Sequence, residues 1–325
     1  MNKLLGIVIS LIYAFFISLA YGQSTFPNKP VHIVIPFPPG GSTDVLGRLL
    51  GASMSNNLGQ SVIVENTGGA GGTIGATKVA RSPADGYTLL FHNMAHASAP
   101  ALYSKLPYNP IQDFEPIGIV TEVPMILVAR KNFPGNNLSD VLAYAKTNGD
   151  KLNFANAGVG ATSQLCEALL KSATGSKWTS VPYKGTGPAL NDLLGGQVDF
   201  ICDQPASTIS HIKAGNLKPI AVATKNRLKI LPQVATFSES GLPGFELTVW
   251  HGLYAPKGTP KEVVDRLAVS LRDTLKDPVI IERYQDMSAS IATPAQATPE
   301  ALQNFLKADV ERWKTALKAA GIQAE

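Results

Sequence analysis

Short runs of apolar, mostly β-branched residues alternate with longer helical patterns from residue 31 onward. Residues 31–35, 62–64 and 88–91 are such runs, and apolar side chains recur at helical spacing from Leu46 to Met54. Continuous apolar strands separated by helices are typical of βαβ units, whose parallel sheet is covered on both faces. The pattern therefore predicts an α/β unit at the start of the chain.

The same alternation begins again after residue 125. Strand-like runs occur there at residues 125–129, 152–155, 181–183, 198–202 and 219–223. A helix is predicted from Pro188 to Leu194, because proline suits a first helical turn and Gly195-Gly196 follows the last one. These features predict a second α/β unit from about residue 125 to 248.

After this second unit, the pattern predicts one more apolar strand, at residues 247–255, and two amphipathic helices. The apolar positions of the two helices are Val264, Leu267, Leu271 and Leu275, and Leu302, Phe305, Val310, Trp313 and Leu317. Such stripes indicate core packing. Since no polar linker separates the two units, we expect chain crossings near residues 121–125 and 246–251, around which two lobes can hinge.

The first 22 residues have a different pattern. Lys3 precedes an apolar stretch that ends at Ala20, and Ala20 and Gly22 place small residues at positions −3 and −1 of a cleavage site. These features predict a secretory signal peptide that is cut after Gly22, the alternative being an uncleaved anchor. No later stretch is apolar enough to span a bilayer, so we expect the mature protein to be soluble and exported.

Composition narrows the possible functions. The chain has 325 residues, of which 45% are hydrophobic and 16% charged, and its formal net charge is +4. This much apolar material excludes a disordered chain, and the lack of a basic cluster argues against nucleic-acid binding. Cys166 and Cys202 can form one disulfide in an exported protein or stay as two buried thiols, and their spacing does not decide between these states.

The sequence lacks the usual signatures of catalysis and cofactor binding. It contains no GxSxG or HExxH motif, residues 40–43 lack the lysine of a phosphate loop, and Ile74 breaks a GxGxxG register. His92 and His96 are four residues apart, as metal ligands on a helix can be, but they follow a predicted strand and have no evident third partner. We favour a loop of polar side chains there, and we expect neither a metal nor another cofactor.

Two glycine-rich loops suggest anion binding. Residues 37–44 join the first strand to its helix, where Ser42 or Thr43 can cap the helix and unpaired N–H groups would face a carboxylate. Residues 158–163 open a helix of the second unit in an equivalent way. Either loop alone has a structural explanation, since tight strand-to-helix turns need glycine and caps. Two such loops in facing lobes favour a carboxylate held between helix N-termini.

Around these loops the sequence resembles the Bug family, the extracytoplasmic solute-binding receptors of tripartite tricarboxylate transport systems. The matching stretches are residues 36–44, 64–66, 68–72, 85–90, 181–185, 187–190, 192–199, 241–244, Trp250 and 255–260. The resemblance runs in order from about Phe26 to Ile322. It implies an α/β protein with the type II periplasmic-binding-protein fold, in which two lobes are joined by two crossover strands and a ligand cleft lies between them.

The resemblance also implies a division of the chain and a set of ligand-binding residues. Residues 1–22 would form the signal peptide, 23–124 and 249–325 the first lobe, and 125–248 the second. The implied ligand-binding residues are Phe37, Pro39, Gly40, Gly41, Ser42, Thr43 and Asn93 in the first lobe, and Ala161, Thr162, Ser163, Tyr183 and Asp203 in the second. Asp203 is equally well explained as a helix cap or turn residue.

The function implied by the resemblance is that of a monomeric periplasmic solute-binding protein. Lobe closure would capture a small organic carboxylate (a di- or tricarboxylate, an amino acid or an aromatic acid) because the closed state binds it more tightly. The protein would deliver this acid to the membrane permease of a tripartite tricarboxylate transporter, or serve a sensor kinase instead. We do not expect an enzyme, although an exported α/β enzyme acting on a carboxylate and a ligand-sensing or scaffold protein are the alternatives.

Overall fold

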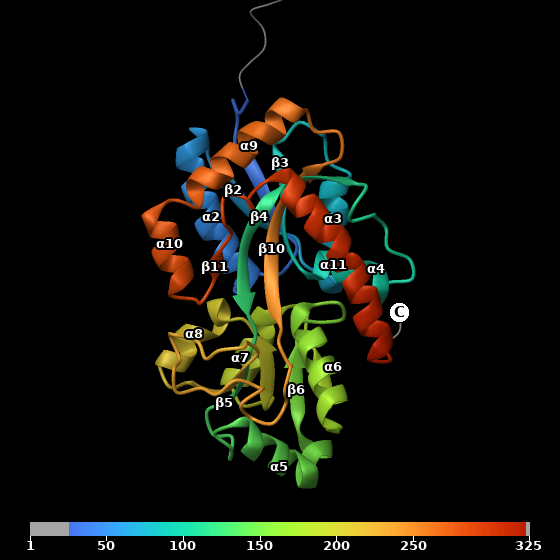
Figure 1. The fold of residues 1–325 in the computed structure, drawn as a ribbon, viewed down its shortest axis with the longest axis vertical. Helices are drawn as coiled ribbons and strands as arrows, with labels where there is room; N and C mark the ends of the chain where they lie inside the picture. The colour runs from blue at the N-terminus through green and yellow to red at the C-terminus, as the bar shows by residue number, and fades with distance from the viewer. Residues whose placement is uncertain (1–25, 323–325) are drawn as a thin grey trace, which may run out of the picture.

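The computed structural model describes residues 26–322, which form two α/β lobes, each built on one sheet (Figure 1). The strand order is β11-β4-β10-β3-β1-β2 in the first sheet and β7-β6-β8-β5-β9 in the second. The predicted signal peptide and its cleavage after Gly22 lie outside the described residues. A search of residues 26–322 finds no helix with the length and apolar character needed to cross a membrane.

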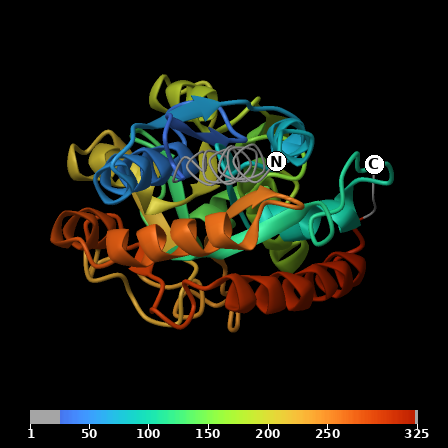
Figure 2. The same ribbon diagram turned by 90° about the horizontal axis from the view of Figure 1, so that it is seen from above.

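The first lobe combines its sheet with six helices. Its strands are β1 (Val31–Ile35), β2 (Val62–Asn66), β3 (Thr88–Asn93), β4 (Phe114–Pro124), β10 (Thr248–Pro256) and β11 (Ser290–Ile291). Its helices are α2 (Ser42–Leu58), α3 (Thr73–Ala80), α4 (Ala95–Leu102), α9 (Lys261–Thr274), α10 (Pro278–Gln285) and α11 (Pro299–Ala319), with a 3-10 turn η1 (Ala70–Gly72) before α3. Helix α2 packs on α9, and α11 packs on α4 and β4; Figure 2 shows α9 and α11 along the same side of the molecule.

The second lobe is smaller. Its strands are β5 (Ile126–Arg130), β6 (Asn153–Asn156), β7 (Thr179–Pro182), β8 (Phe200–Asp203) and β9 (Leu217–Val222). Its helices are α5 (Leu138–Asn148), α6 (Thr162–Thr174), α7 (Thr186–Leu194) and α8 (Pro205–Lys213), with a 3-10 turn η2 (Gly149–Lys151) after α5. The predicted helix at residues 188–194 is confirmed as α7, which begins two residues earlier and ends before Gly195.

Parallel pairing holds for only part of each sheet. Strand β1 pairs in parallel with β2 and β3, and β6 pairs in parallel with β7 and β8, as the sequence pattern predicts. Strand β10, however, lies antiparallel between β3 and β4, and β5 lies antiparallel between β8 and β9. Each inserted strand enters from the other lobe and therefore runs against its neighbours. The two lobes thus share one topology, and the sheets are mixed rather than parallel.

Close packing of helix on sheet builds the core of the first lobe. The apolar residues of β1 are fully buried, as expected for a strand covered on both faces. Gly47 faces this sheet from α2, and a Cβ there would collide with Ile35 and Phe91. Glycine at this position therefore lets α2 lie close to the sheet.

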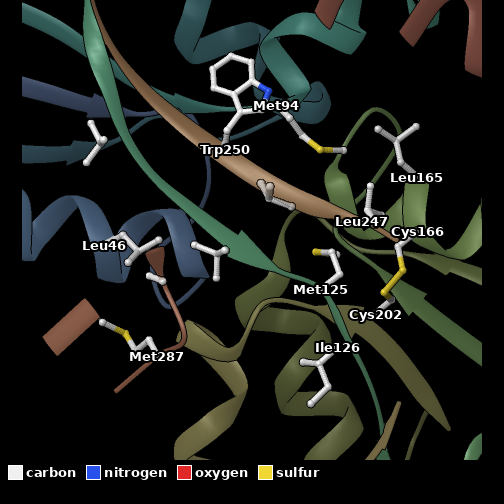
Figure 3. Packing of buried hydrophobic residues seen from close by; sticks show 14 of the residues in the cluster. Leu46, Met94, Met125, Ile126, Leu165, Cys166, Cys202, Leu247, Trp250 and Met287 are labelled. Carbon is white, nitrogen blue, oxygen red and sulfur yellow. A yellow bond between two sulfur atoms is a disulfide. The ribbon is translucent and has the colours of Figure 1, made fainter. Parts of the chain in front are cut away.

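The two lobes are joined where β4 leads into β5 and where residues 223–247 lead from β9 to β10. The Met125 N–H donates to Leu247 O (3.0 Å), Leu247 N–H to Ala223 O (2.9 Å), and Ala223 N–H to Met125 O (2.8 Å). Figure 3 shows Met125 and Leu247 on these neighbouring segments. The two connections therefore lie side by side, joined by hydrogen bonds.

Cys166 and Cys202 form a disulfide, which decides between the two states that their spacing left open (Figure 3). Cys166 lies in α6 and Cys202 in β8, with Cα atoms 6.1 Å apart, and both residues are fully buried. The bond ties the first turns of α6 to the end of β8, just before Asp203. It therefore crosslinks two elements that lead to the lobe interface.

Candidate functional site

In the first lobe, a buried aspartate shapes the loop between β1 and α2. Asp44 accepts hydrogen bonds from Gly40 N–H (3.0 Å) and Asn66 Nδ2 (2.8 Å) and forms an ion pair with Arg48 (2.9 Å). Burial alone would raise the pKa of Asp44, but the hydrogen bonds outweigh it and hold the pKa below its usual value. Asn66 Nδ2 also donates to Phe37 O (3.0 Å). These bonds fix the predicted binding loop to the start of α2.

The start of α2 is not capped in the way the sequence suggested. Its N-cap residue is Gly41, and within the described residues no side chain caps it, so the expectation that Ser42 or Thr43 caps the helix is wrong. The Thr43 hydroxyl instead accepts from Asn93 Nδ2 (3.1 Å) and lies 3.2 Å from His251 Nε2. Ser42 Oγ is buried and has no partner in residues 26–322. Among residues 26–322, no side chain therefore uses the N–H groups of the first turn of α2 or the Ser42 hydroxyl.

The corresponding loop of the second lobe lies between β6 and α6. Ser163 Oγ accepts from Ala157 N–H (2.7 Å), which leaves the hydroxyl proton available to another acceptor. Asn156 Oδ1 accepts from Gly158 N–H (2.9 Å), so a side chain at the end of β6 holds the turn. The N-cap residue is Ala161, and this start, too, has no side-chain cap from the described part of the chain. Thr162 and Ser163 are buried beside it.

The buried side chain of Glu167 supports this loop through hydrogen bonds. Asn156 Nδ2 donates to Glu167 Oε2 (2.6 Å), which also accepts from Ser180 Oγ (2.9 Å). Burial raises the pKa of Glu167, although both hydrogen bonds act in the opposite direction. Because Asn156 bonds both Glu167 and the turn, the carboxylate helps to position the start of α6.

Two more helices of the second lobe, α7 and α8, begin without side-chain caps from the residues described, behind Gly185 and Gln204. Between them lies Asp203, which is buried and accepts from Gln204 N–H (2.8 Å), Ser207 Oγ (3.3 Å) and the Thr186 side chain. Burial raises its pKa to about 6 against the effect of these bonds. Its contacts lie within the second lobe, so Asp203 acts at least as a turn residue that orders both helix starts.

Tyr183 also makes its polar contact within the second lobe. Its hydroxyl donates to Asp192 Oδ2 of α7 (2.6 Å). Partial burial, together with this carboxylate, raises the pKa of Tyr183 to about 12. The ring can line the lobe, as the sequence resemblance implies, but the hydroxyl is already engaged with Asp192.

The first-lobe loop lies directly against the start of α7. A Cβ on Gly187 would lie 2.6 Å from Pro39 O, and one on Gly185 would lie 2.5 Å from Pro38 Cδ. A Cβ on Gly41 would lie 3.4 Å from Thr186 Cβ. Helix α8 also packs on α2 of the other lobe. The starts of α2, α7 and α8 therefore meet at one interface between the lobes.

A second contact between the lobes involves the glycine-rich turn before α3. A Cβ on Gly71 would lie 2.5 Å from Val159 O of the second lobe. The Tyr103 hydroxyl donates to the same carbonyl (2.8 Å) and would lie 2.8 Å from a Cβ on Gly160. Tyr103 thus links the end of α4 to the loop that opens α6. This hydrogen bond joins the two lobes directly.

The histidines flagged in the sequence do not lie in a loop. His92 is in β3 and His96 in α4; the loop prediction there is wrong because α4 begins directly after the strand and continues through Pro100. Both are fully buried, with ring centroids 5.0 Å apart. Burial lowers the pKa of His96 to about 3. Within residues 26–322, no three His, Cys, Asp or Glu side chains are grouped to hold a metal ion.

The structure therefore brings the predicted loops of both lobes to one interface but adds residues that the sequence reading omitted. Pro39 and Gly41 face the start of α7, whose Thr186 and Gly187 were missed, as was Tyr103. Gly185-Thr186-Gly187, just before Pro188, has the same glycine-rich strand-to-helix character as the other loops and was the available signal. Ligand binding by the twelve predicted residues stays a prediction.

Comparison with known proteins identifies the family. The model of the family described as "Tripartite tricarboxylate transporter family receptor" (TctC) matches residues 46–322. A UPF0065 protein from the TAR-I ttuE-ttuC' intergenic region of Agrobacterium vitis is 45% identical over 303 residues, which are 93% of this chain and 88% of the relative. Protein BugT of Bordetella pertussis is 34% identical over 99% of this chain and 98% of its own.

Solved structures agree with this assignment. The periplasmic binding protein BugD is 47% identical and superposes with a TM-score of 0.90, covering 92% of this chain and all of its own. MatC from Rhodopseudomonas palustris, solved with bound malate, is 39% identical with a TM-score of 0.86 over 90% of this chain and all of its own. A further R. palustris protein, solved with adipate, is 34% identical with a TM-score of 0.87 over 92% of this chain and all of its own. The predicted two-lobed periplasmic-binding-protein fold is confirmed, and the chain belongs to the TctC, or Bug, family of periplasmic solute-binding receptors.

Proposed function

We propose that this receptor binds one small organic carboxylate between its lobes and delivers it to a tripartite tricarboxylate transporter. The observation that carries the proposal is the set of helix starts at the lobe interface. Helices α2, α6, α7 and α8 begin there without side-chain caps from described residues. Free N–H groups and the positive end of each helix dipole favour an anion.

The side chains beside these helix starts fit the same ligand. Ser42 and Ser163 are buried, and each hydroxyl proton is free to donate to a carboxylate oxygen. Arg48, in the second turn of α2, is paired with Asp44. Recognition would therefore rest on neutral donors rather than on a guanidinium. The malate and adipate of the related R. palustris structures support a carboxylate as the ligand class.

The lobes in this proposal are residues 23–124 with 249–325, and residues 125–248. The hydrogen-bonded crossing of Met125, Ala223 and Leu247 supports these limits. Closure would bring the α2 start against α7 and Tyr103 against Val159, as the close contacts of the two lobes support. The ligand would then shift the open–closed equilibrium by its tighter binding to the closed state.

A ligand screen tests the binding step. The mature protein, from Gln23 onward, is titrated calorimetrically with mono-, di- and tricarboxylates, malate and adipate included, and its melting temperature is recorded with each acid. A true ligand at about a hundred times its dissociation constant adds about 2.7 kcal/mol of stability. We expect one class of acid to bind at one per chain and to be recovered unchanged. Turnover of the acid would favour an exported enzyme, and a panel without any binding would refute the proposal.

Delivery needs its own test, because binding alone does not establish it. Cells that lack the receptor gene are supplied with wild-type protein or with a variant that no longer binds, and uptake of the radiolabelled acid is measured. Uptake restored by the wild type alone supports delivery to a permease. Normal uptake without the receptor would contradict it.

A further inference from the structure

His92 lies next to the candidate site but is not part of the predicted ligand set. Its ring meets Phe37 edge-on, with centroids 5.4 Å apart. Its Nε2 would lie 2.9 Å from a Cβ on Gly72, the N-cap residue of α3. The adjoining Gly71 is the residue that meets Val159 of the second lobe. The Nε2 edge of His92 therefore faces the turn where the first lobe contacts the second.

The hydrogen bonds of His92 define which ring nitrogen carries the proton. Asn93 N–H donates to His92 Nδ1 (2.8 Å), so Nδ1 presents its lone pair and the proton of the neutral ring is on Nε2. Burial, with His96 and His251 nearby, lowers the pKa of His92 well below its ordinary value, so the ring is neutral. The Nε2–H is then a fully buried donor with no partner within the described part of the chain.

An unpaired buried donor is costly and calls for a partner. The neighbouring histidine, His96, is placed differently from His92. His96, which also has unpaired nitrogens, stacks on Tyr108 (5.5 Å) and meets Phe114 edge-on (4.9 Å), and it has no ring contact with Phe37. Of the two adjacent histidines, His92 is the one placed at the lobe interface.

The first turn of α3 adds a second feature favourable to an acceptor. Gly72 is followed directly by the helix, and no side chain among residues 26–322 caps it. The N–H groups of that turn and His92 Nε2–H thus lie on the same side of the first lobe, beside Phe37 of the β1–α2 loop. Together they form a patch of neutral donors separate from the start of α2.

We propose that His92 donates its Nε2–H to an oxygen of the bound acid and so determines which acids fit beside the start of α3. The proposal rests on the proposed function, because it assumes that an acid binds between the lobes. It assigns the receptor a second point of recognition in the first lobe, besides the hydroxyls and N–H groups at the start of α2. A neutral N–H there donates to a carboxylate, carbonyl or hydroxyl oxygen and disfavours an alkyl group in the same place.

Substitutions that move or remove the donor test this role. Gln places its amide near the Nε2 position, Asn places it near Nδ1, and Leu removes it. For the acid that the wild type binds most tightly, we expect a ten- to hundredfold weaker affinity in His92→Leu and His92→Asn, with most of the affinity kept in His92→Gln. The matched control is His96→Gln, a buried histidine of the same cluster, which should keep its affinity within about twofold.

Calorimetry on each folded variant separates the outcomes. Equal affinity in wild type and His92→Leu, or equal losses in the Gln and Asn variants, would overturn the role of His92 while leaving the proposed function intact. If His92→Leu fails to fold, the Gln–Asn contrast still decides. If the wild type itself binds no acid, the proposed function fails, and the role of His92 fails with it.

A spectroscopic readout is independent of the variants. In protein labelled with 15N-histidine, we expect His92 to show the Nε2-protonated form without ligand and its Nε2–H proton to move downfield when the acid is saturating. A proton on Nδ1, or an Nε2–H signal that does not respond to saturation, would overturn the proposal.

Discussion

Helices begin in two different ways in the two regions of this molecule. Away from the lobe interface, α5, α10 and α11 begin behind Asn137, Asp277 and Thr298, and each of these side chains accepts an N–H from the first turn. At the interface, α2, α6, α7 and α8 begin behind residues whose side chains cap nothing in the described structure. Within residues 26–322, α3 also begins without a side-chain cap near the interface, behind Gly72, and α4 and α9 begin without one behind Met94 and Pro260.

If the proposed function holds, this difference is how one chain both stabilises its helices and keeps hydrogen-bond donors for a ligand. A side-chain cap contributes about 1 kcal/mol, so each uncapped start gives up stability that the capped helices have. At the interface, glycine or alanine is the N-cap residue of α2, α3, α6 and α7, which also allows the loops to approach closely. Under the proposed function, the uncapped starts of α2, α6, α7 and α8 give up stability in order to bind an anion.

The largest change in free energy is expected on removing the disulfide, which lies close to the uncapped starts of α6 and α8. Cys166 lies in the first turns of α6, and Cys202 lies three residues before α8. Replacing both by alanine should remove about 3 kcal/mol from the free energy of unfolding, measured by urea denaturation. A loss below about 1 kcal/mol would show that the rest of the lobe holds these helix starts without the bond.

A methyl group at the interface should separate binding from stability. Gly187→Ala adds a Cβ that lies 2.6 Å from Pro39 O of the other lobe when the lobes are closed. We expect ligand affinity to fall about a hundredfold, equivalent to about 2.7 kcal/mol. The unliganded protein should not be less stable, because alanine is favoured over glycine in a helix. The control is Gly195→Ala at the other end of α7, and unchanged affinity in Gly187→Ala would contradict the close approach of the lobes.

The pH dependence of stability tests the state of Asp203, the buried carboxyl group that orders the uncapped starts of α7 and α8. Its pKa is about 6 in the folded protein against 3.8 ordinarily, so the folded state favours the protonated acid. The stability from this proton is complete below about pH 4 and is lost as the pH rises through 6. Between pH 4 and 7, the wild type should therefore lose about 2 kcal/mol relative to Asp203→Asn in urea unfolding. A difference that is constant or has the opposite sign would contradict the raised pKa.

A single hydroxyl at the start of α6 should matter for binding more than for folding. Ser163→Ala removes the donor predicted for a ligand oxygen, and we expect about tenfold weaker affinity by calorimetry, about 1.4 kcal/mol. Ser270→Ala is the matched control, because Ser270 is equally buried but lies in α9. Unchanged affinity in Ser163→Ala would refute its assigned role.

The smallest change in free energy is expected on removing the side-chain cap of α11. Thr298 Oγ1 accepts from Ala301 N–H (3.2 Å) at the start of α11. Thr298→Ala should cost about 1 kcal/mol of unfolding free energy and leave ligand affinity within twofold. Weaker ligand binding in this variant would break the distinction between helix starts that stabilise the fold and those that bind.

Much of the fold could be predicted because the pattern of apolar positions reports each βαβ unit locally. The strand at 31–35, the helix ending at Gly195 and both long C-terminal helices followed from such patterns. The antiparallel insertion of β10 could not, because its neighbours in the sheet are set by where the chain crosses between lobes. Strand β4 and helix α10 were also missed, although Asp277-Pro278 is a recognisable helix start.

The candidate site, too, has features that the sequence could predict and features that it could not. The loops at 37–44 and 158–163 are visible in the sequence, since glycine before a helix is a local signal. The bond from Tyr103 to Val159 joins residues 56 apart, and no local pattern reveals it. The disulfide likewise depends on how α6 lies against β8, which residue spacing does not fix. Contacts between the lobes thus had to come from the structure.

The buried disulfide has a practical consequence for single-molecule work. The chain contains two cysteines, and both are used in this bond, so the protein offers no reactive thiol of its own. Cysteines introduced at exposed positions, such as Val279 in α10 and Tyr144 in α5, would take up fluorescent dyes without background labelling. Energy transfer between the dyes would then follow the opening and closing of one molecule in real time.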